Sequence, residues 1–389
     1  MIKQERVNTA HRIYCIVKQE EHKHKGNTLL AILLATIMVA LAFNSTTVSA
    51  AQPLNFSGEK AYTHIQSQMA FGNRIPNTTA HQNCVSYIVS TLKGLGLTVT
   101  YQNFTGAQGE GAGVPFVNII GVLKANQTAE KRVLLAAHYD TRPFSDHTIT
   151  GAPQTPDYSH PVPGANDGAS GVAVLLEMAR AMKPYNRTHD IYFLFLDGED
   201  FGTDVQSSML YGSRYYAAAM TQSDISATDY LILFDMVGDK ELDIYREQNS
   251  DIALQDKIFS KAASLGITQF INSTKYQMLD DHIPFRDHGV RVVDLIDFDY
   301  INDTVNYWHT SLDTLDKVSA TSLSDTGRAV EGFLVDDIVH HAPINNTTVI
   351  PPPKPKPKDE KPFIPGFETA ILVATLVVVV ALRAQKKNF

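Results

Sequence analysis

The chain has 389 residues, a formal net charge of −8 and only two cysteines. The negative charge argues against nucleic-acid binding, because such binding depends on basic residues that neutralise phosphates. Cys15 lies in an N-terminal leader and Cys84 is therefore left without an internal partner, which excludes a disulfide framework and a thiolate metal site.

Residues 1–50 are predicted to be a leader. Residues 29–43, LLAILLATIMVALAF, are uninterrupted apolar residues with basic residues upstream, and Val48 and Ala50 form a small-residue cleavage site. This pattern is typical of a secretory signal. The alternative is a retained N-terminal anchor, although the run is short compared with the ~20 residues that span a bilayer.

Residues 51–345 suit one large α/β domain. Apolar periodicity predicts the following elements in chain order: helices at 57–70 and 79–95, strands at 97–104, 114–123 and 132–140, a helix at 167–182, a strand at 190–200, a helix from 209, strands at 229–239 and 290–299, and a helix at 319–340. Strands that alternate with helices predict three layers, with a mostly parallel twisted sheet between helices on both faces. Ligands of such folds bind at the carboxyl ends of the strands.

Imidazoles and carboxylates stand at these strand ends and at one helix start: His138, Asp140, Asp167, Glu199, Asp200, Asp235 and, in the later loop YWHTSLDT, His309. Carboxylates crowded into one crevice would repel one another strongly unless a cation neutralised them. Nitrogen and oxygen ligands without thiolates suit zinc in a catalytic site. Adjacent residues at a strand end point in different directions. We therefore predict that Asp200 binds the metal, while Glu199 faces the metal-bound water as general base.

Five ordered motifs within about residues 80–335 resemble the co-catalytic zinc aminopeptidases, a family that also contains the animal and bacterial glutaminyl cyclases: AHYDTRP, PGANDGASGVAVLLEMAR, FLDGEDFG, FDMVGD and YWHTSLDT. The resemblance implies the α/β fold of that family and a zinc site. His138, Asp167 and Asp235 would hold one ion. Asp167, Asp200 and His309 would hold the other.

The resemblance also assigns Glu199 to the family's general base. Asp200 departs from the pattern, because most aminopeptidases have Glu there. Asp140 lies on the same strand face as His138 and could orient that imidazole, or it could be a turn residue. The long loop at 141–163 carries three more polar candidates, Asp146, His147 and His160, which we expect to be ordinary loop residues.

Two activities fit the resemblance. An aminopeptidase with two zinc ions would hydrolyse N-terminal residues from peptides, whereas a glutaminyl cyclase with one zinc ion would form N-terminal pyroglutamate. Features of LDDHIPF and YWHT resemble cyclases, in which Asp280 would join a hydrogen-bond network with Glu199, and His282 and Trp308 would line the pocket. Trp308 could instead be plain core packing, and DDHIP could be the start of a helix.

The complete two-metal set favours the aminopeptidase, which we place first. In both readings the substrates are peptide or protein N-termini. Another acyl-hydrolysing specificity and an inactive binding domain are further alternatives.

Dense N-x-S/T sequons support a secreted, glycosylated surface: they start at Asn55, Asn77, Asn103, Asn126, Asn186, Asn272, Asn302, Asn345 and Asn346. Residues 346–366 form a Pro/Lys-rich spacer of the extended, semi-rigid type. Residues 367–389 contain an apolar run followed by basic residues, as expected of a cytoplasmic end.

The stretch PGFETAILVATLVVVVALR resembles the C-terminal sorting tails of archaeal surface proteins, which are cut and replaced by a lipid. A simple membrane anchor is the alternative. Either reading predicts an extracellular protein tethered to the cell surface, with the membrane as a partner.

Overall fold

The computed structural model describes residues 53–129, 131–300 and 305–339. The predicted leader, the spacer and the C-terminal segment lie outside these residues. Within the described ranges, no helix combines the length and the apolar character needed to cross a bilayer.

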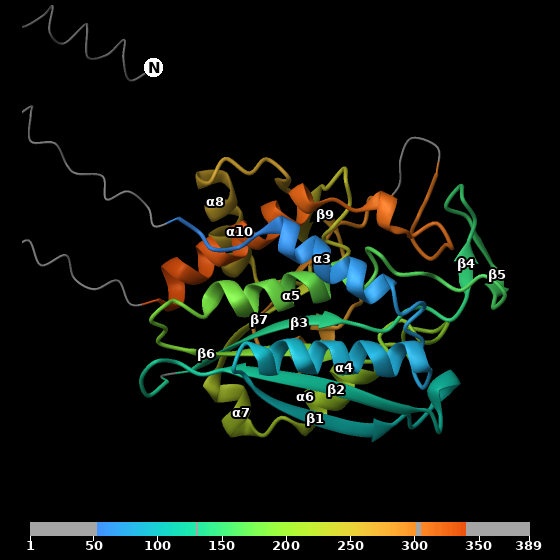
Figure 1. Ribbon diagram of the computed structural model, residues 1–389, viewed down its shortest axis with the longest axis horizontal. Helices are drawn as coiled ribbons and strands as arrows, with labels where there is room; N and C mark the ends of the chain where they lie inside the picture. The colour runs from blue at the N-terminus through green and yellow to red at the C-terminus, as the bar shows by residue number, and fades with distance from the viewer. Residues whose placement is uncertain (1–52, 130, 301–304, 340–389) are drawn as a thin grey trace, which may run out of the picture. The chain divides into compact units, whose positions relative to one another are not determined.

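A six-stranded sheet forms the centre of the fold, in the order β1-β2-β6-β3-β7-β10 (Figure 1). Its strands are β1 (Thr98–Thr105), β2 (Pro115–Leu123), β3 (Arg132–His138), β6 (Asp190–Leu196), β7 (Thr228–Asp235) and β10 (Val292–Ile296). Strands β6, β3, β7 and β10 run parallel to one another, and β1 and β2 add antiparallel pairings at one edge. The predicted mostly parallel sheet is therefore confirmed, with an antiparallel edge.

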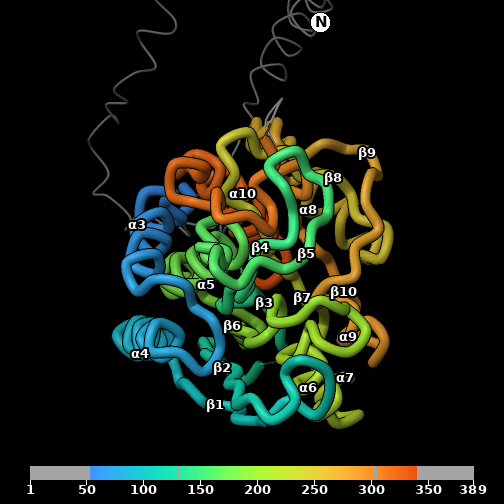
Figure 2. The backbone as a smooth tube through the Cα atoms, turned by 90° about the vertical axis from the view of Figure 1, so that its right-hand side faces the viewer, coloured from blue at the N-terminus to red at the C-terminus, as the bar shows by residue number. Residues whose placement is uncertain are grey.

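Helices cover both faces of the sheet. One face carries α3 (Gly58–Met69), α4 (Thr79–Gly94), α5 (Ala169–Met182), α8 (Ile252–Ser264) and α10 (Ala320–Ile338), and the other carries α6 (Tyr211–Ala219), α7 (Gln222–Ala227) and α9 (His282–Asp287). In Figure 2, α3, α4 and α5 lie to the left of the strands, and α6, α7 and α9 lie to the right. Along β3, Val133 and Leu135 join one core cluster and Leu134 joins the other, because successive side chains of a strand point to opposite faces. The three predicted layers are confirmed.

The central helix α5 is buried at every residue except Arg180. Gly171 allows it to approach the sheet closely, since a Cβ atom there would lie 2.1 Å from the carbonyl oxygen of Phe234 in β7. This contact fixes the start of α5, just after Asp167, at the carboxyl ends of the parallel strands.

Some elements were not predicted from the sequence. They are the hairpin of β4 (Ser145–His147) and β5 (Pro153–Asp157), the small parallel sheet of β8 (Ile244–Glu247) and β9 (Phe270–Tyr276), the helices α7 and α8, and two short 3₁₀ turns at Gly109–Gly111 and Leu315–Lys317. Helix α9 confirms the alternative in which DDHIP begins a helix. The β4–β5 hairpin projects beyond the carboxyl end of β3 (Figure 1). Its sequence is polar and rich in Pro, so it lacks the apolar alternation by which strands are recognised.

Candidate metal centre

The polar residues predicted to meet at the strand ends do meet there. His138 is the last residue of β3 and Asp235 is the last residue of β7. Glu199 and Asp200 follow β6, which pairs with β3 on the side opposite to β7. Because these three strands are parallel neighbours, their carboxyl ends bring residues from distant parts of the chain into one crevice.

His138 lies between two carboxylates. Its Nε2 is 3.1 Å from Asp167 Oδ1 and 3.2 Å from Asp235 Oδ1. All three residues are buried, and one donor atom of each lies within 4.8 Å of the others. Burial would lower the pKa of His138, but hydrogen bonds with the surrounding carboxylates raise it well above its ordinary value.

Asp167, Asp200 and His309 form a second group. His309 Nε2 lies 3.3 Å from Asp200 Oδ1 and 3.9 Å from Asp167 Oδ2. Asp167 therefore turns one oxygen toward each group, as a bridging ligand would. Asp200 Oδ2 is buried and has no hydrogen-bond partner.

Both groups have the chemistry and spacing of a zinc site. Two ligands of a tetrahedral zinc ion are about 3.3–3.5 Å apart, because each lies ~2.0–2.2 Å from the ion. The measured separations range from 3.1 to 3.9 Å. Imidazole and carboxylate donors suit zinc, and a cation would neutralise carboxylates that are costly to bury alone. The residues fit one zinc ion or two.

Asp140 holds both neighbouring segments of the site. It is fully buried, and its two oxygens accept hydrogen bonds from the backbone N–H groups of Glu199, at 3.1 Å, and Asp200, at 3.2 Å. Asp140 Oδ1 also lies 3.5 Å from His138 Nδ1. Asp140 therefore fixes the backbone of Glu199 and Asp200, while its role in orienting the His138 ring stays a prediction.

Glu199 lies beside the first group, with Oε2 at 3.9 Å from His138 Nδ1. Burial raises the pKa of Glu199 well above its ordinary value; the charge of His138 opposes this rise, and the carboxylates of Asp200 and Asp280 add to it. A carboxyl group that protonates this readily can accept a proton during a reaction and return it.

Backbone conformation at the site is unusual. Gly198, in the turn that leads from β6 to Glu199, has a φ of 74°. His309 has a φ of 56°, and Met236, directly after Asp235, has a φ of 47°. Residues other than glycine rarely adopt this left-handed backbone conformation, because it is strained for them. Such backbone strain persists where the surrounding structure enforces it, often at functional sites.

Arg142 and Asp146 belong to the site, although the sequence did not single out Arg142 and we expected Asp146 to be a plain loop residue. Asp146 Oδ1 is 3.0 Å from His309 Nδ1. Arg142 forms ion pairs with both Asp146 and Asp200. Burial would raise the pKa of Asp200, but the charges of Arg142 and His309 hold it below its ordinary value. The available sequence signal was a basic residue just after the ligand motif, followed four positions later by an acid.

The other two loop candidates differ from each other. The ring centroids of His147 and Trp308 lie 4.4 Å apart. His147, Asp146 and His309 also form a group of possible metal ligands, with donor atoms within 4.8 Å of one another. His160 is exposed and pairs with Asp157 on the hairpin, as expected of a loop residue.

The three predicted pocket residues have different environments. Trp308 is half-buried and stacks on His309, with ring centroids 3.7 Å apart. Asp280 is buried and close enough to Glu199 to influence its pKa. His282 has no exposed surface, and its ring nitrogens face Glu247 and Asp294, each at 3.6 Å. The start of α9 is therefore packed into the interior, and the prediction that His282 lines the pocket stays a prediction.

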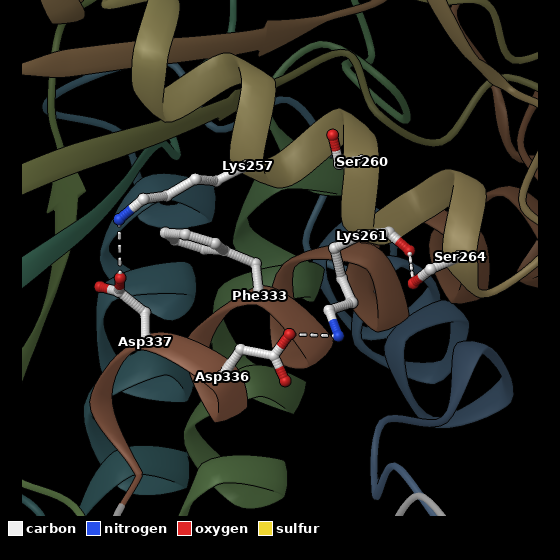
Figure 3. Close-up of a pocket in the computed structure, with 7 residues that line it drawn as sticks. All are labelled: Lys257, Ser260, Lys261, Ser264, Phe333, Asp336 and Asp337. Carbon is white, nitrogen blue, oxygen red and sulfur yellow. Dashed lines mark hydrogen bonds and ion pairs between the residues drawn. The ribbon is translucent and has the colours of Figure 1, made fainter.

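A surface groove between α8 and α10 lies apart from these residues (Figure 3). Across it, Lys257 pairs with Asp337 and Lys261 pairs with Asp336. Since both lysines are already paired with carboxylates, the groove offers no strong reason to assign it a ligand.

Comparisons with known proteins fit this geometry. The sequence model of peptidase family M28 matches residues 118–334, which include all the donors of both groups. The chain belongs to peptidase family M28. Enzymes of this family depend on zinc, so the protein is a zinc-dependent peptidase or a glutaminyl cyclase-like enzyme.

Relatives with both activities resemble the chain. Aminopeptidase YwaD of Bacillus subtilis is 28% identical over 236 residues, which cover 57% of this chain but only 44% of the relative. The structure of Porphyromonas gingivalis glutaminyl cyclase is 32% identical, with a TM-score of 0.66, and the match covers 73% of this chain and 99% of that one. A Zn-dependent exopeptidase from Parabacteroides distasonis is also 32% identical, with a TM-score of 0.64 and coverage of 72% and 98%. These matches support the α/β fold and leave both M28 activities open.

Proposed function

We propose that this M28 enzyme is a glutaminyl-peptide cyclotransferase that uses one zinc ion, held by Asp167, Asp200 and His309. The difference between the two metal groups carries this proposal. In the group around His138, a proton on Nε2 reaches both carboxylates directly, at 3.1 and 3.2 Å. In the other group, Asp200 Oδ2 is buried without a partner, so this oxygen is free to bind a cation.

The names of the matching structures give further support. Glutaminyl cyclases of Porphyromonas gingivalis and Tannerella forsythia are each covered to 99%, although a Zn-dependent exopeptidase is covered to 98%. We therefore place the cyclase first, which reverses the order reached from the sequence alone.

The proposed substrate is a peptide or protein that begins with Gln. Bound zinc supplies a Lewis acid that polarises the carbonyl of the Gln side-chain amide. The substrate's α-amine attacks that carbon, a C–N bond closes the five-membered ring, and the bond to the amide nitrogen breaks. Glu199 accepts the proton that the amine loses and delivers it to the departing nitrogen, which leaves as ammonia.

Neighbouring residues are suited to support this proton transfer. Asp140 holds the backbone of Glu199 through a hydrogen bond of 3.1 Å. Burial and the nearby carboxylate of Asp280 raise the pKa of Glu199, which favours the return of the proton. The half-buried ring of Trp308 stacks on His309 and offers an apolar wall beside the proposed zinc ligands.

An aminopeptidase is the second candidate, because the complete set of His138, Asp167 and Asp235 could hold a second zinc ion. Glu199 would then take a proton from the attacking water and deliver it to the leaving amine. The same carboxyl group serves both reactions, so its presence does not distinguish them.

Two substrates and a zinc count separate the candidates. A peptide with N-terminal Gln should release ammonia and end with a blocked N-terminus, while leucine p-nitroanilide should remain intact. The zinc content should be one ion per chain, and Asp235→Asn should leave it unchanged. Release of p-nitroaniline, no ammonia from the Gln peptide, and a fall from two ions to one in Asp235→Asn would instead identify the peptidase.

We also propose that the enzyme acts outside the cell and is tethered to the membrane through its C-terminal segment. The support is the apolar run at 29–43, the dense sequons, and the Pro/Lys-rich spacer before the run at 369–382. Fractionation of the source cells should find the enzyme with the membrane and accessible to added protease. Intact soluble protein that retains residues 369–389 in the medium would contradict the tether.

A further inference from the structure

The turn that leads into Asp167 is held on both sides by buried charged side chains. It comprises residues 163–167, PGAND, and connects the long polar loop to α5. Gly164 has a φ of 74°, and a Cβ atom there would meet the carbonyl oxygen of Asp167. A residue other than glycine would therefore force the turn open. The turn ends at the carboxylate whose two oxygens face the two metal groups.

Asp313 holds the N–H side of this turn, and it has no exposed surface. Its Oδ1 accepts a hydrogen bond from the backbone N–H of Asn166 at 2.8 Å, and its Oδ2 accepts one from the backbone N–H of Asp167 at 3.1 Å. The backbone carbonyl of Asp313 also accepts a hydrogen bond from the N–H of Ala165, at 3.3 Å. One buried residue therefore satisfies three successive N–H groups of the turn, which would be costly to bury unpaired.

Tyr300 fixes the carboxylate of Asp313 in turn. The Tyr300 side chain is fully buried, and its hydroxyl donates a hydrogen bond to Asp313 Oδ1 at 2.7 Å. Asp313 lies four positions after His309, in the same loop. A single loop therefore carries one proposed zinc ligand and the residue that holds the backbone of another.

Arg74 holds the carbonyl side of the turn. It is fully buried between α3 and α4, and its Nη1 and Nη2 donate hydrogen bonds to the carbonyl oxygens of Pro163, at 3.0 Å, and Gly164, at 2.6 Å. Its Nε donates to the carbonyl oxygen of Tyr139, at 3.2 Å, at the end of β3. Burial lowers the pKa of Arg74, and nearby charges, including that of Asp313, oppose this. The guanidinium thus connects the turn to the strand end that carries His138.

We propose that Asp313 and Arg74 are positioning residues, which fix the turn before zinc binds and thereby strengthen the binding of zinc by Asp167. A ligand that is already held in its binding geometry loses little conformational freedom when the metal arrives. The inference rests on the proposed zinc site but is the same for a cyclase and a peptidase, because Asp167 faces both metal groups. Arg74 lies before residue 118, where the match to the family model begins.

The zinc affinity of the metal-free full chain, measured by competition with a fluorescent zinc indicator, tests the role of Asp313. Asp313→Asn should weaken zinc binding about 10–100-fold, the usual effect of losing a residue that orients a metal ligand, because the amide nitrogen cannot accept a backbone N–H. Glu331→Gln is the matched control. Glu331 is also fully buried, and it accepts hydrogen bonds from the N–H groups of Asn55 and Phe56 and from the hydroxyl of Tyr185. It belongs to neither metal group, so the zinc affinity of Glu331→Gln should equal that of wild type.

Hydrogen exchange without zinc separates positioning from a simple loss of negative charge. The amides of residues 165–167 should be protected in metal-free wild type and should exchange at least about tenfold faster in Asp313→Asn, because they lose their acceptors. Tyr300→Phe keeps the charge of Asp313 but releases its carboxylate. It should therefore change both the exchange and the zinc affinity in the same direction as Asp313→Asn, by a smaller factor.

Arg74→Met tests the other side of the turn and serves if Asp313→Asn does not fold. It should also speed exchange of residues 165–167 without zinc. Its control is Arg187→Met, which should leave that exchange unchanged: Arg187 is buried and donates to backbone carbonyls before the start of β6, at the end of that strand opposite to Glu199.

Three results would overturn the proposal: unchanged zinc affinity in folded Asp313→Asn, an equal loss of affinity in Glu331→Gln, or unprotected amides at 165–167 in metal-free wild type. Wild-type protein that binds no zinc would overturn the proposed function as well, so the two failures are distinguishable.

Discussion

Replacing Arg142 with Met would remove a buried positive charge beside the proposed zinc ligands while keeping the length of the side chain. The Arg142 side chain is 3% exposed, and its guanidinium pairs with Asp200 and Asp146. It also lies over the ring of Phe144, 4.5 Å from the centroid. The substitution therefore leaves two carboxylates without their cation, while part of the packing against Phe144 is kept.

The expected cost depends on whether zinc is bound. Removing one partner of a buried ion pair costs about 3–5 kcal/mol. Asp146 is only partly buried, so we expect the lower end, about 3 kcal/mol, in the metal-free protein. Zinc on Asp200 supplies a replacement charge, so the loaded Arg142→Met protein should lose only about 1 kcal/mol relative to loaded wild type. By linkage, zinc should then bind the variant about 30-fold more tightly, since each 1.4 kcal/mol is a factor of ten.

Urea unfolding with excess chelator and with excess zinc measures both costs. Arg142→Lys is the matched control, because it keeps the charge but loses the two-pronged geometry of the guanidinium, and it should be affected less than Arg142→Met in the metal-free state. A metal-free cost for Arg142→Met below about 1 kcal/mol, or equal costs with and without zinc, would refute the claim that Arg142 and zinc neutralise the same carboxylate.

Four further results are expected. Glu199→Gln should lower kcat by a factor of about 10²–10⁴ with unchanged zinc content, because the proton acceptor is lost while the shape of the side chain is kept. Steady-state kinetics together with metal analysis checks this. Near-normal turnover would remove Glu199 from the mechanism. Chelation should abolish activity and added zinc should restore it, whereas activity that survives complete zinc removal would contradict the assigned centre. Burial would raise the pKa of Asp146, but hydrogen bonds with His147, His309 and Arg142 hold it well below its ordinary value. The ionised carboxylate therefore stabilises the fold above about pH 4, and this contribution is lost as the pH falls. When the free energy of unfolding is measured over a pH series, Asp146→Asn should lose less stability than wild type at acid pH. Gly171→Ala should lower the free energy of unfolding by about 1–3 kcal/mol or more, because the new methyl group meets a backbone carbonyl of β7 at 2.1 Å. Gly94→Ala is the control, since nothing lies within 4 Å of the added carbon, and its thermal unfolding should be nearly unchanged.

The sequence alone determined most of the core elements and the main donors. The strands at 132–140 and 229–239 were predicted because apolar runs carry their own local signal. β3 lies within the first range, and β7 begins one residue before the second. Their polar ends predicted the donors, since parallel strands bring their carboxyl ends to one edge. The ambiguity between peptidase and cyclase persisted, because both reactions use the same residue types at the same strand ends.

Only the tertiary structure decided which donors pair with one another and which charges balance them. Asp146 and His309 are 163 positions apart, and no local periodicity links a polar loop to a ligand so distant along the chain. The acid in the apolar strand β10 gave no hint that Asp294 faces His282, which comes from a separate helix. Local patterns report which face of an element is apolar, whereas the partner of a buried charge depends on how distant segments pack.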